Sequence, residues 1–268
     1  MKRATRRLLS LLGYKSLYPP QEEAVRRGVE DGANLLVATP TASGKTLIGA
    51  IAIANALERD PNGRAFYLVP LRSVAMEKYS ELRVLEKLGI SVGLAIGDVV
   101  TNPGARLLVS TYEKLDSMLR SRPGFLDGLR VLVVDEIHYL GDEKRGIVLE
   151  SLLASILSVS SNLQIVALSA TVPNAGEIAE WLGAEAIVMD WRPVPLREAV
   201  LKGYELYYPR EGQWDELERV TGKPYLDAAL AVNRGGGQAL VFSMSRRRVV
   251  QLASSSARHY RRLSYNKS

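Results

Sequence analysis

Short apolar runs alternate with helical patterns along residues 1–190, and this alternation constrains the fold most strongly. Each run is nearly continuous in apolar residues, whereas a half-exposed strand would alternate apolar and polar side chains. Buried strands separated by helices predict a parallel α/β sheet that is covered by helices on both faces. The predicted strands are Leu35–Ala38, Ala65–Val69, Ile90–Ile96, Arg106–Ser110, Arg130–Val134, Leu163–Leu168 and Ala186–Met189.

Polar signatures follow several of these predicted strands. The sequences TASGKT, PLRS, STYEK, DEIH and SAT each begin at or just after the carboxyl end of a strand. Ligands of open parallel sheets bind beyond that edge. We therefore expect the five signatures to contribute to one site.

The stretch Leu35–Thr46, which reads LLVATPTASGKT, has the layout of a phosphate-binding loop. Backbone N–H groups and a helix N-terminus hold the phosphates, a lysine reaches the outer phosphates and a threonine hydroxyl binds Mg²⁺. Thr39 occupies the position of the first glycine of the usual pattern. A strand, a turn and a buried helix without a ligand would also fit this stretch alone. The predicted nucleotide-binding residues are Thr41, Ala42, Ser43, Gly44, Lys45 and Thr46.

Two carboxylates follow the apolar run Val131–Val134 directly. Asp135 is predicted to hold Mg²⁺ together with Thr46, and Glu136 to orient or deprotonate the attacking water. Acids that only cap a helix are the alternative interpretation. The phosphate loop upstream favours the catalytic one, in which Lys45, Asp135 and Glu136 carry the chemistry.

Gln21 lies just inside a predicted helix upstream of the phosphate loop. Its amide can pair with N6 and N7 of adenine together. By itself, such a glutamine would be a surface residue. Beside the phosphate loop, we expect it to contact the adenine of ATP.

Composition excludes several classes of site. The 268 residues include no cysteine and two histidines, so neither a disulfide framework nor a metal site of thiolates or imidazoles is expected. No stretch approaches the length of a membrane span, which predicts a soluble cytoplasmic protein. The net charge of +6 arises in the tail, where residues 228–268 hold eight Lys or Arg and no acid. Nucleic-acid binding by the main domain must therefore be argued from motifs.

The chain is predicted to contain one complete domain and part of a second. We expect a first domain at 1–190, a linker at 191–202 and a partial second domain with a basic tail at 203–268. Within the last part, Trp214–Val232 is predicted to be helical and Gln238–Phe242 to be a strand. Residues Ser254–Ser268 are predicted to be poorly ordered.

These motifs together resemble those of superfamily 2 helicases of the superkiller-like branch, and within it the archaeal Holliday-junction-migration (Hjm-type) DNA helicases. The resemblance covers Leu17 to Leu252, and that branch also lacks the first loop glycine. Its segments are TPTASGKT, DEIH and SAT, with Val69–Ser73, Ser110–Asp116, Trp191–Leu196 and Ala239–Ser243. It implies a RecA-like P-loop fold, and ATP and Mg²⁺ as cofactors.

The resemblance also implies roles for individual residues. His138, Ser169 and Thr171 would couple the nucleotide site to the nucleic-acid track. Arg72, Ser73, Thr111 and Tyr112 would lie along that track and contact mostly phosphates. Thr111 is also placed to cap the helix that follows it. In the parent enzyme, ATP hydrolysis would drive 3′-to-5′ movement along single-stranded or forked DNA, with roles in DNA repair and recombination.

No segment like Q-x-x-G-R-x-G-R is present, so the arginine finger of a second motor domain is absent from the sequence. We expect a truncated monomer that binds nucleotide, hydrolyses it slowly and does not unwind alone. An RNA-directed relative, a nucleotide-gated binding module without turnover and a non-helicase P-loop ATPase remain alternatives.

Overall fold

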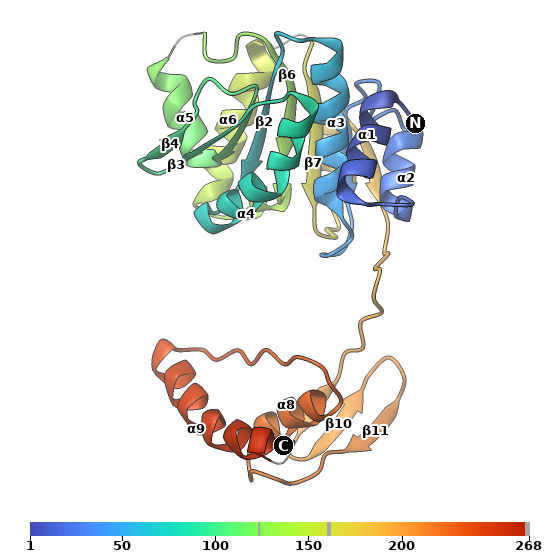
Figure 1. Ribbon diagram of the computed structural model, residues 1–268, viewed down its shortest axis with the longest axis vertical. Coiled ribbons are helices and arrows are strands. Elements are labelled where there is room, and N and C mark those ends of the chain that lie inside the picture. The colour runs from blue at the N-terminus through green and yellow to red at the C-terminus, as the bar shows by residue number, and fades with distance from the viewer. Residues whose placement is uncertain (123, 160–161, 266–268) are drawn as a thin grey trace. The chain divides into compact units, whose positions relative to one another are not determined.

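The structure is a computed structural model, and it describes residues 1–122, 124–159 and 162–265 (Figure 1). The chain divides into two compact units, Met1–Val194 and Pro195–Ser268. The boundary falls inside the predicted linker at 191–202.

The first unit is built on an eight-stranded sheet with the order β4-β3-β5-β2-β6-β7-β1-β8. All neighbouring strands are parallel except β3 and β4, which are antiparallel. The predicted α/β class is confirmed. The strands are β1 (Leu35–Ala38), β2 (Arg64–Val69), β3 (Val92–Ile96), β4 (Val99–Thr101), β5 (Leu107–Thr111), β6 (Leu129–Val134), β7 (Gln164–Ser169) and β8 (Glu185–Val188).

Helices cover both faces of this sheet, as Figure 1 shows. One apolar core joins the sheet to α1 (Arg3–Leu12), α2 (Pro19–Arg26), α3 (Lys45–Arg59), α4 (Arg72–Leu82) and the 3₁₀ helix η1 (Arg83–Leu88). The other core joins it to α5 (Tyr112–Ser121), the 3₁₀ helix η2 (Ile137–Gly141), α6 (Arg145–Val159) and α7 (Ala175–Trp181). In β2, Tyr67 belongs to the first core and its neighbours Phe66 and Leu68 to the second, as the two-residue period of a strand requires.

Helix α3 crosses the sheet so closely that a glycine is needed at the contact. A Cβ at Gly49 would lie 2.9 Å from Val133 Cγ1 and 3.1 Å from Tyr67 Cε2. We expect Gly49→Ala to lower the free energy of unfolding by about 1–3 kcal/mol, because overpacking outweighs the better helix propensity of alanine. The control is Gly176→Ala in α7, where a Cβ meets no atom within 4 Å. Urea denaturation should show the control variant unchanged or stabilised, and equal stability of the two variants would contradict the packing argument.

The second unit contains the antiparallel sheet β11-β10-β9 and two helices. Its elements are β9 (Val200–Lys202), β10 (Glu205–Tyr208), β11 (Gln213–Glu216), α8 (Pro224–Arg234) and α9 (Arg246–Tyr265). The last three residues of the predicted linker therefore form a strand. That residues 203–268 are part of a second RecA-like domain stays a prediction.

Two expectations for this unit are wrong. The predicted helix at Trp214–Val232 begins only at Pro224, and Trp214 instead pairs with Tyr207 across β10 and β11. Proline is accommodated in the first turn of a helix but not in its interior, which explains the later start. Residues 238–242 form no strand, because strand formation needs a paired neighbour and none is hydrogen-bonded to this segment.

Helix α9 extends to Tyr265, inside the segment Ser254–Ser268 that was predicted to be poorly ordered, and that expectation stays a prediction. Residues 246–265 contain neither glycine nor proline, so nothing in the sequence interrupts the helix. Residues 266–268 lie outside the described part of the chain. No helix among the described residues is long and apolar enough to cross a membrane.

Candidate functional site

The phosphate loop joins the end of β1 to the start of α3. Ala42 and Gly44 adopt left-handed backbone conformations with φ of 65° and 78°. Gly44 is the N-cap of α3, so the loop passes directly into the helix N-terminus. The free N–H groups and positive end of such a helix favour an anion. The local geometry therefore agrees with the predicted loop, including the departure at Thr39, whose hydroxyl hydrogen-bonds the Ser43 hydroxyl at 2.7 Å.

The Lys45 side chain is folded into this loop. Its Nζ donates hydrogen bonds to the carbonyl oxygens of Thr39 at 2.8 Å and Pro40 at 3.1 Å. Burial lowers the pKa of Lys45, and the negative charges of Glu136 and Asp135 act in the opposite direction. An ammonium that is partly desolvated beside two main-chain carbonyls is well placed to exchange these weak acceptors for a phosphate.

Gln21 is 3% exposed and bonded to the same loop. Its Oε1 accepts from the backbone N–H of Tyr18 at 2.8 Å, and its Nε2 donates to the Gly44 carbonyl at 3.0 Å. A Cβ at Gly44 would lie 2.3 Å from that Nε2, so this contact as well as the positive φ requires glycine. The structure thus places Gln21 against the phosphate loop, and the adenine contact stays a prediction.

The two carboxylates follow the end of β6, at the same edge of the sheet as the phosphate loop. Asp135 Oδ2 accepts from the Tyr67 hydroxyl at 3.0 Å, and its Oδ1 accepts from the Glu136 N–H at 3.0 Å. Burial raises the pKa of Asp135, and the neighbouring charge of Glu136 raises it further. Glu136 itself has a φ of 54°, which turns the chain sharply after the strand. Such strain in a residue without glycine's freedom is frequent at functional sites.

One hydroxyl lies beside both predicted Mg²⁺ ligands. The Tyr67 hydroxyl donates a hydrogen bond to the Asp135 carboxylate at 3.0 Å, and the nearby Thr46 side chain lowers the pKa of Tyr67, which burial raises. The Thr46 and Asp135 side chains therefore both lie near this tyrosine, and oxygen ligands of this kind suit Mg²⁺. No group of three or more His, Cys, Asp or Glu residues in the described chain could hold a metal ion by itself. The residues fit an ion that is held by two protein oxygens together with phosphate oxygens.

His138, Ser169 and Thr171 occupy neighbouring segments at this edge. His138 Nδ1 lies 3.3 Å from Glu136 Oε2. The Ser169 hydroxyl is completely buried without a hydrogen-bond partner in the described structure, and the Ser169 carbonyl accepts from Thr39 N at 3.2 Å. Strand β7, which ends at Ser169, contacts η2, which carries His138. Thr171 is exposed. The coupling role predicted for these residues is untested.

A second part of the site is a cavity of about 700 Å³. It collects three of the four residues predicted for the nucleic-acid track, namely Arg72, Ser73 and Thr111. The Arg72 guanidinium lies against Gly97, where a Cβ would approach within 2.5 Å. The other lining residues are Pro70, Leu71, Asp98, Glu113, Lys114, Ser117 and Arg145.

Tyr112, the fourth predicted track residue, does not line this cavity. It is 0% exposed, and its hydroxyl donates to the Asp135 carbonyl oxygen. The prediction that its side chain contacts nucleic acid is therefore wrong, because the first turn of α5 directs it into the core. Thr111 is the N-cap residue of α5, as predicted, although its side chain makes no capping hydrogen bond.

Comparison with known proteins settles the family. The family model described as DEAD/DEAH box helicase matches residues 18–178. This chain belongs to the DEAD/DEAH box helicase family. The resemblance that the motifs indicated is confirmed.

Among its relatives, this DEAD/DEAH box chain is similar to the ATP-dependent DNA helicase Hel308 of Aeropyrum pernix. The two are 51% identical over 250 residues, which cover 93% of this chain and 34% of the relative. Hel308 of Pyrobaculum calidifontis is 46% identical over 261 residues, with 94% and 36% covered. The chain spans about a third of the length of these curated relatives.

Solved structures agree on the fold. The DUF1998 helicase MrfA is 23% identical with a TM-score of 0.72, and the match covers 98% of this chain and 41% of MrfA. MrfA bound to DNA is 22% identical, again with a TM-score of 0.72, covering 96% and 38%. The predicted RecA-like α/β class of this DEAD/DEAH box chain is supported by both the family and the fold.

Sequence reasoning missed two side chains of this DEAD/DEAH box site. Tyr67 hydrogen-bonds Asp135 and lies near Thr46, and Arg145 lines the cavity and pairs with Glu113 at 3.6 Å. Tyr67 is part of an apolar strand, where a buried tyrosine resembles any core residue. Its hydroxyl needs a partner when buried, and that need was the available signal.

The Tyr112 hydroxyl is expected to stabilise this DEAD/DEAH box fold and to position Asp135, whose carboxylate belongs to the site. Burial raises the pKa of Tyr112, so the hydroxyl remains a donor at all working pH values. Tyr112→Phe leaves a buried carbonyl unpaired and should lower the free energy of unfolding by about 1–3 kcal/mol. Tyr79→Phe is the control, since the Tyr79 hydroxyl has no hydrogen bond among the described residues. Equal urea midpoints for the two variants would contradict this role.

Proposed function

We propose that this chain is the first RecA-like motor domain of an ATP-dependent DNA helicase, and that residues 203–268 begin a second. The observation that carries the proposal is the gathering of the phosphate loop, Asp135, Glu136 and the Arg72 cavity along one sheet edge. The choice of DNA rests on the names of the Hel308 relatives. In the parent enzyme, hydrolysis would drive 3′-to-5′ movement in DNA repair.

The phosphate loop would bind ATP through its backbone N–H groups and Lys45. Lys45 Nζ would leave the Thr39 and Pro40 carbonyls for the outer phosphates, a stronger charged acceptor. Thr46 and Asp135 would hold Mg²⁺, which supplies positive charge against the outer phosphates when bound. Gln21 would stay bonded to Gly44 or turn to the adenine.

Glu136 is the proposed base for the attacking water. It follows the buried Asp135 directly, and its side chain is 29% exposed, so a water can reach it. His138 lies beside Glu136 and would couple changes at the nucleotide site to Ser169 and Thr171. The roles of these residues are supported by their common position at the ends of β6 and β7.

The Arg72 cavity is the proposed nucleic-acid track. Arg72, Lys114 and Arg145 give it three cationic side chains, and Ser73 and Thr111 supply hydroxyls. Such groups bind phosphates without reading the bases. We expect single-stranded or forked DNA as the partner of the whole enzyme.

The test is binding of a fluorescent ATP analogue with and without Mg²⁺, followed by phosphate release in the presence of single-stranded DNA, forked DNA or RNA. We expect Mg²⁺-dependent binding and slow turnover that DNA stimulates more than RNA. A folded chain that binds no nucleotide would sink the proposal. Stronger stimulation by RNA would favour an RNA-directed motor, and binding without turnover would favour a nucleotide-gated module.

A further inference from the structure

The first helix of the chain is basic in an otherwise acidic stretch. Residues 1–18 contain five Lys or Arg and no Asp or Glu, whereas residues 19–227 contain 22 basic and 29 acidic residues. Arg3, Arg6 and Arg7 are all exposed. Their spacing of three and four residues places them on one face of α1. The positive charge is therefore concentrated in one stripe.

Little of this charge is neutralised by the protein. Arg3 approaches Glu58 at 4.0 Å, at the limit of an ion pair, and its side chain is 77% exposed. Neither Arg6 nor Arg7 forms an ion pair with any residue in the described part of the chain. Five of the other exposed arginines in the described part of the first unit are instead paired with carboxylates, namely Arg26, Arg27, Arg83, Arg120 and Arg130. The stripe is free to bind an external anion.

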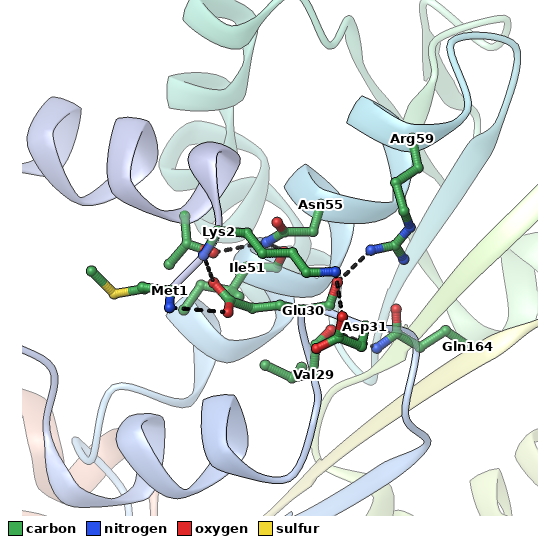
Figure 2. Close-up of polar contacts among 10 residues, drawn as sticks. Met1, Lys2, Val29, Glu30, Asp31, Ile51, Asn55, Arg59 and Gln164 are labelled. Atoms are coloured by element: carbon green, nitrogen blue, oxygen red, sulfur yellow. Dashed lines mark hydrogen bonds and ion pairs between the residues drawn. The ribbon is translucent and has the colours of Figure 1, made fainter.

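The opposite face of α1 fixes the helix to the domain. Leu8 and Leu9 are buried in the core shared with α3, and the buried Asn55 side chain donates to the Thr5 hydroxyl at 2.8 Å. At the start of the helix, the backbone N–H of Lys2 donates to the buried Glu30 carboxylate at 2.8 Å (Figure 2). Buried polar contacts of this kind hold one geometry, because either partner alone would be left unpaired. The arginines therefore project from a rigid support.

We propose that the exposed face of α1 (Arg3, Arg6 and Arg7) binds the phosphate backbone of nucleic acid, as a contact separate from the Arg72 cavity. None of the residues that line that cavity belongs to α1. The inference rests on the proposed function, because the ligand is the nucleic acid on which the motor acts. A membrane surface fits less well, since helices that lie on membranes insert an apolar face, and that of α1 is packed against the protein.

The binding is expected to be independent of sequence. Arginines on a rigid helix that make only phosphate contacts position a strand or duplex without reading its bases. Tyr14, which follows the helix and is 47% exposed, is available to stack on an unpaired base. A single strand and a duplex arm present the same phosphate chemistry, and the experiment separates them.

The test uses fluorescence anisotropy of the full chain with a labelled single strand and with a labelled duplex, over a range of salt concentrations. The variant is Arg6→Gln with Arg7→Gln, and the control is Arg26→Gln with Arg27→Gln, which removes the same charge from the C-terminal end of α2. We expect about tenfold weaker binding for the α1 variant at 0.1 M salt, and a salt slope smaller by about 1.8 on duplex or 1.4 on single strand. The control should match wild type. If the α1 variant binds only the single strand or only the duplex more weakly, that ligand is the source of the phosphates.

An Arg72→Ala variant separates this inference from the proposed function. If Arg72→Ala weakens binding while the α1 variant matches wild type in affinity and salt slope, the α1 contact is refuted and the track survives. If wild type binds neither ligand, both fail. The proposal would also be refuted if the α1 variant lost binding only to vesicles of phosphatidylcholine with about 30% phosphatidylserine. This test mixture is arbitrary and contains about one anionic lipid in three. Unchanged melting temperatures establish that the variants are folded.

Discussion

Lys45→Ala is expected to abolish detectable binding of a fluorescent ATP analogue, raising its Kd by at least about 100-fold, which corresponds to about 2.7 kcal/mol. Lys45 is the only lysine of the phosphate loop, and its Nζ already lies against the loop carbonyls of Thr39 and Pro40. Without it, the charge of the outer phosphates would be met by backbone dipoles and Mg²⁺ alone. Anisotropy titration with Mg²⁺ present measures the effect.

The matched control for Lys45 is Lys78→Ala. Lys78 is also partly buried and close enough to affect Asp135 electrostatically, but its Nζ is held by Glu81 at 2.9 Å. We expect this control to bind the analogue within about threefold of wild type, a change of roughly 0.7 kcal/mol. Lys45→Ala should remain folded, because burial already disfavours its charge. A folded Lys45→Ala chain with wild-type affinity would refute the phosphate-loop assignment.

Glu136→Gln is expected to keep nucleotide binding and to lower turnover by about 10²–10⁴-fold. The amide has nearly the shape of the carboxylate but cannot accept a proton from water. Asp135, whose carboxylate is held by Tyr67 and the Glu136 N–H, keeps its contacts in this variant. Binding and catalysis should therefore separate.

Single-turnover phosphate release with excess protein measures this effect, because the expected wild-type rate is slow. Glu143→Gln is the control, an exposed glutamate on the segment that follows η2. It should retain wild-type turnover. Equal rates for Glu136→Gln and Glu143→Gln would remove Glu136 from the catalytic role and leave the base unidentified.

The sequence predicted the sheet of the first unit well because its strands are buried on both faces. Continuous apolar runs are easily recognised, and parallel strands bring their carboxyl ends to one edge, so the grouping of Lys45 and Asp135 followed from chain order. The small sheet β9–β11 was missed because its strands are short and largely exposed, and they carry no strong apolar pattern. Their pairing depends on contacts between strands rather than on local sequence.

Side-chain direction was the other limit of prediction. Thr111 and Tyr112 are adjacent in sequence, yet one lines the cavity and the other points into the core. Which side each takes depends on where β5 ends and α5 begins, and boundaries are the least certain part of any such prediction. The basic stripe of α1 was overlooked for a different reason, since only its packing against α3 distinguishes it from a solvated tail.

The adjacency of Thr111 and Tyr112 has a thermodynamic consequence. One peptide bond separates a residue in the wall of the cavity from a residue that holds the Asp135 backbone. If a ligand in the cavity changes the affinity for nucleotide through this junction, nucleotide must change the affinity for that ligand by the same factor. Tyr112→Phe would therefore weaken both effects by the same factor, and titrating either ligand against the other would measure a single quantity.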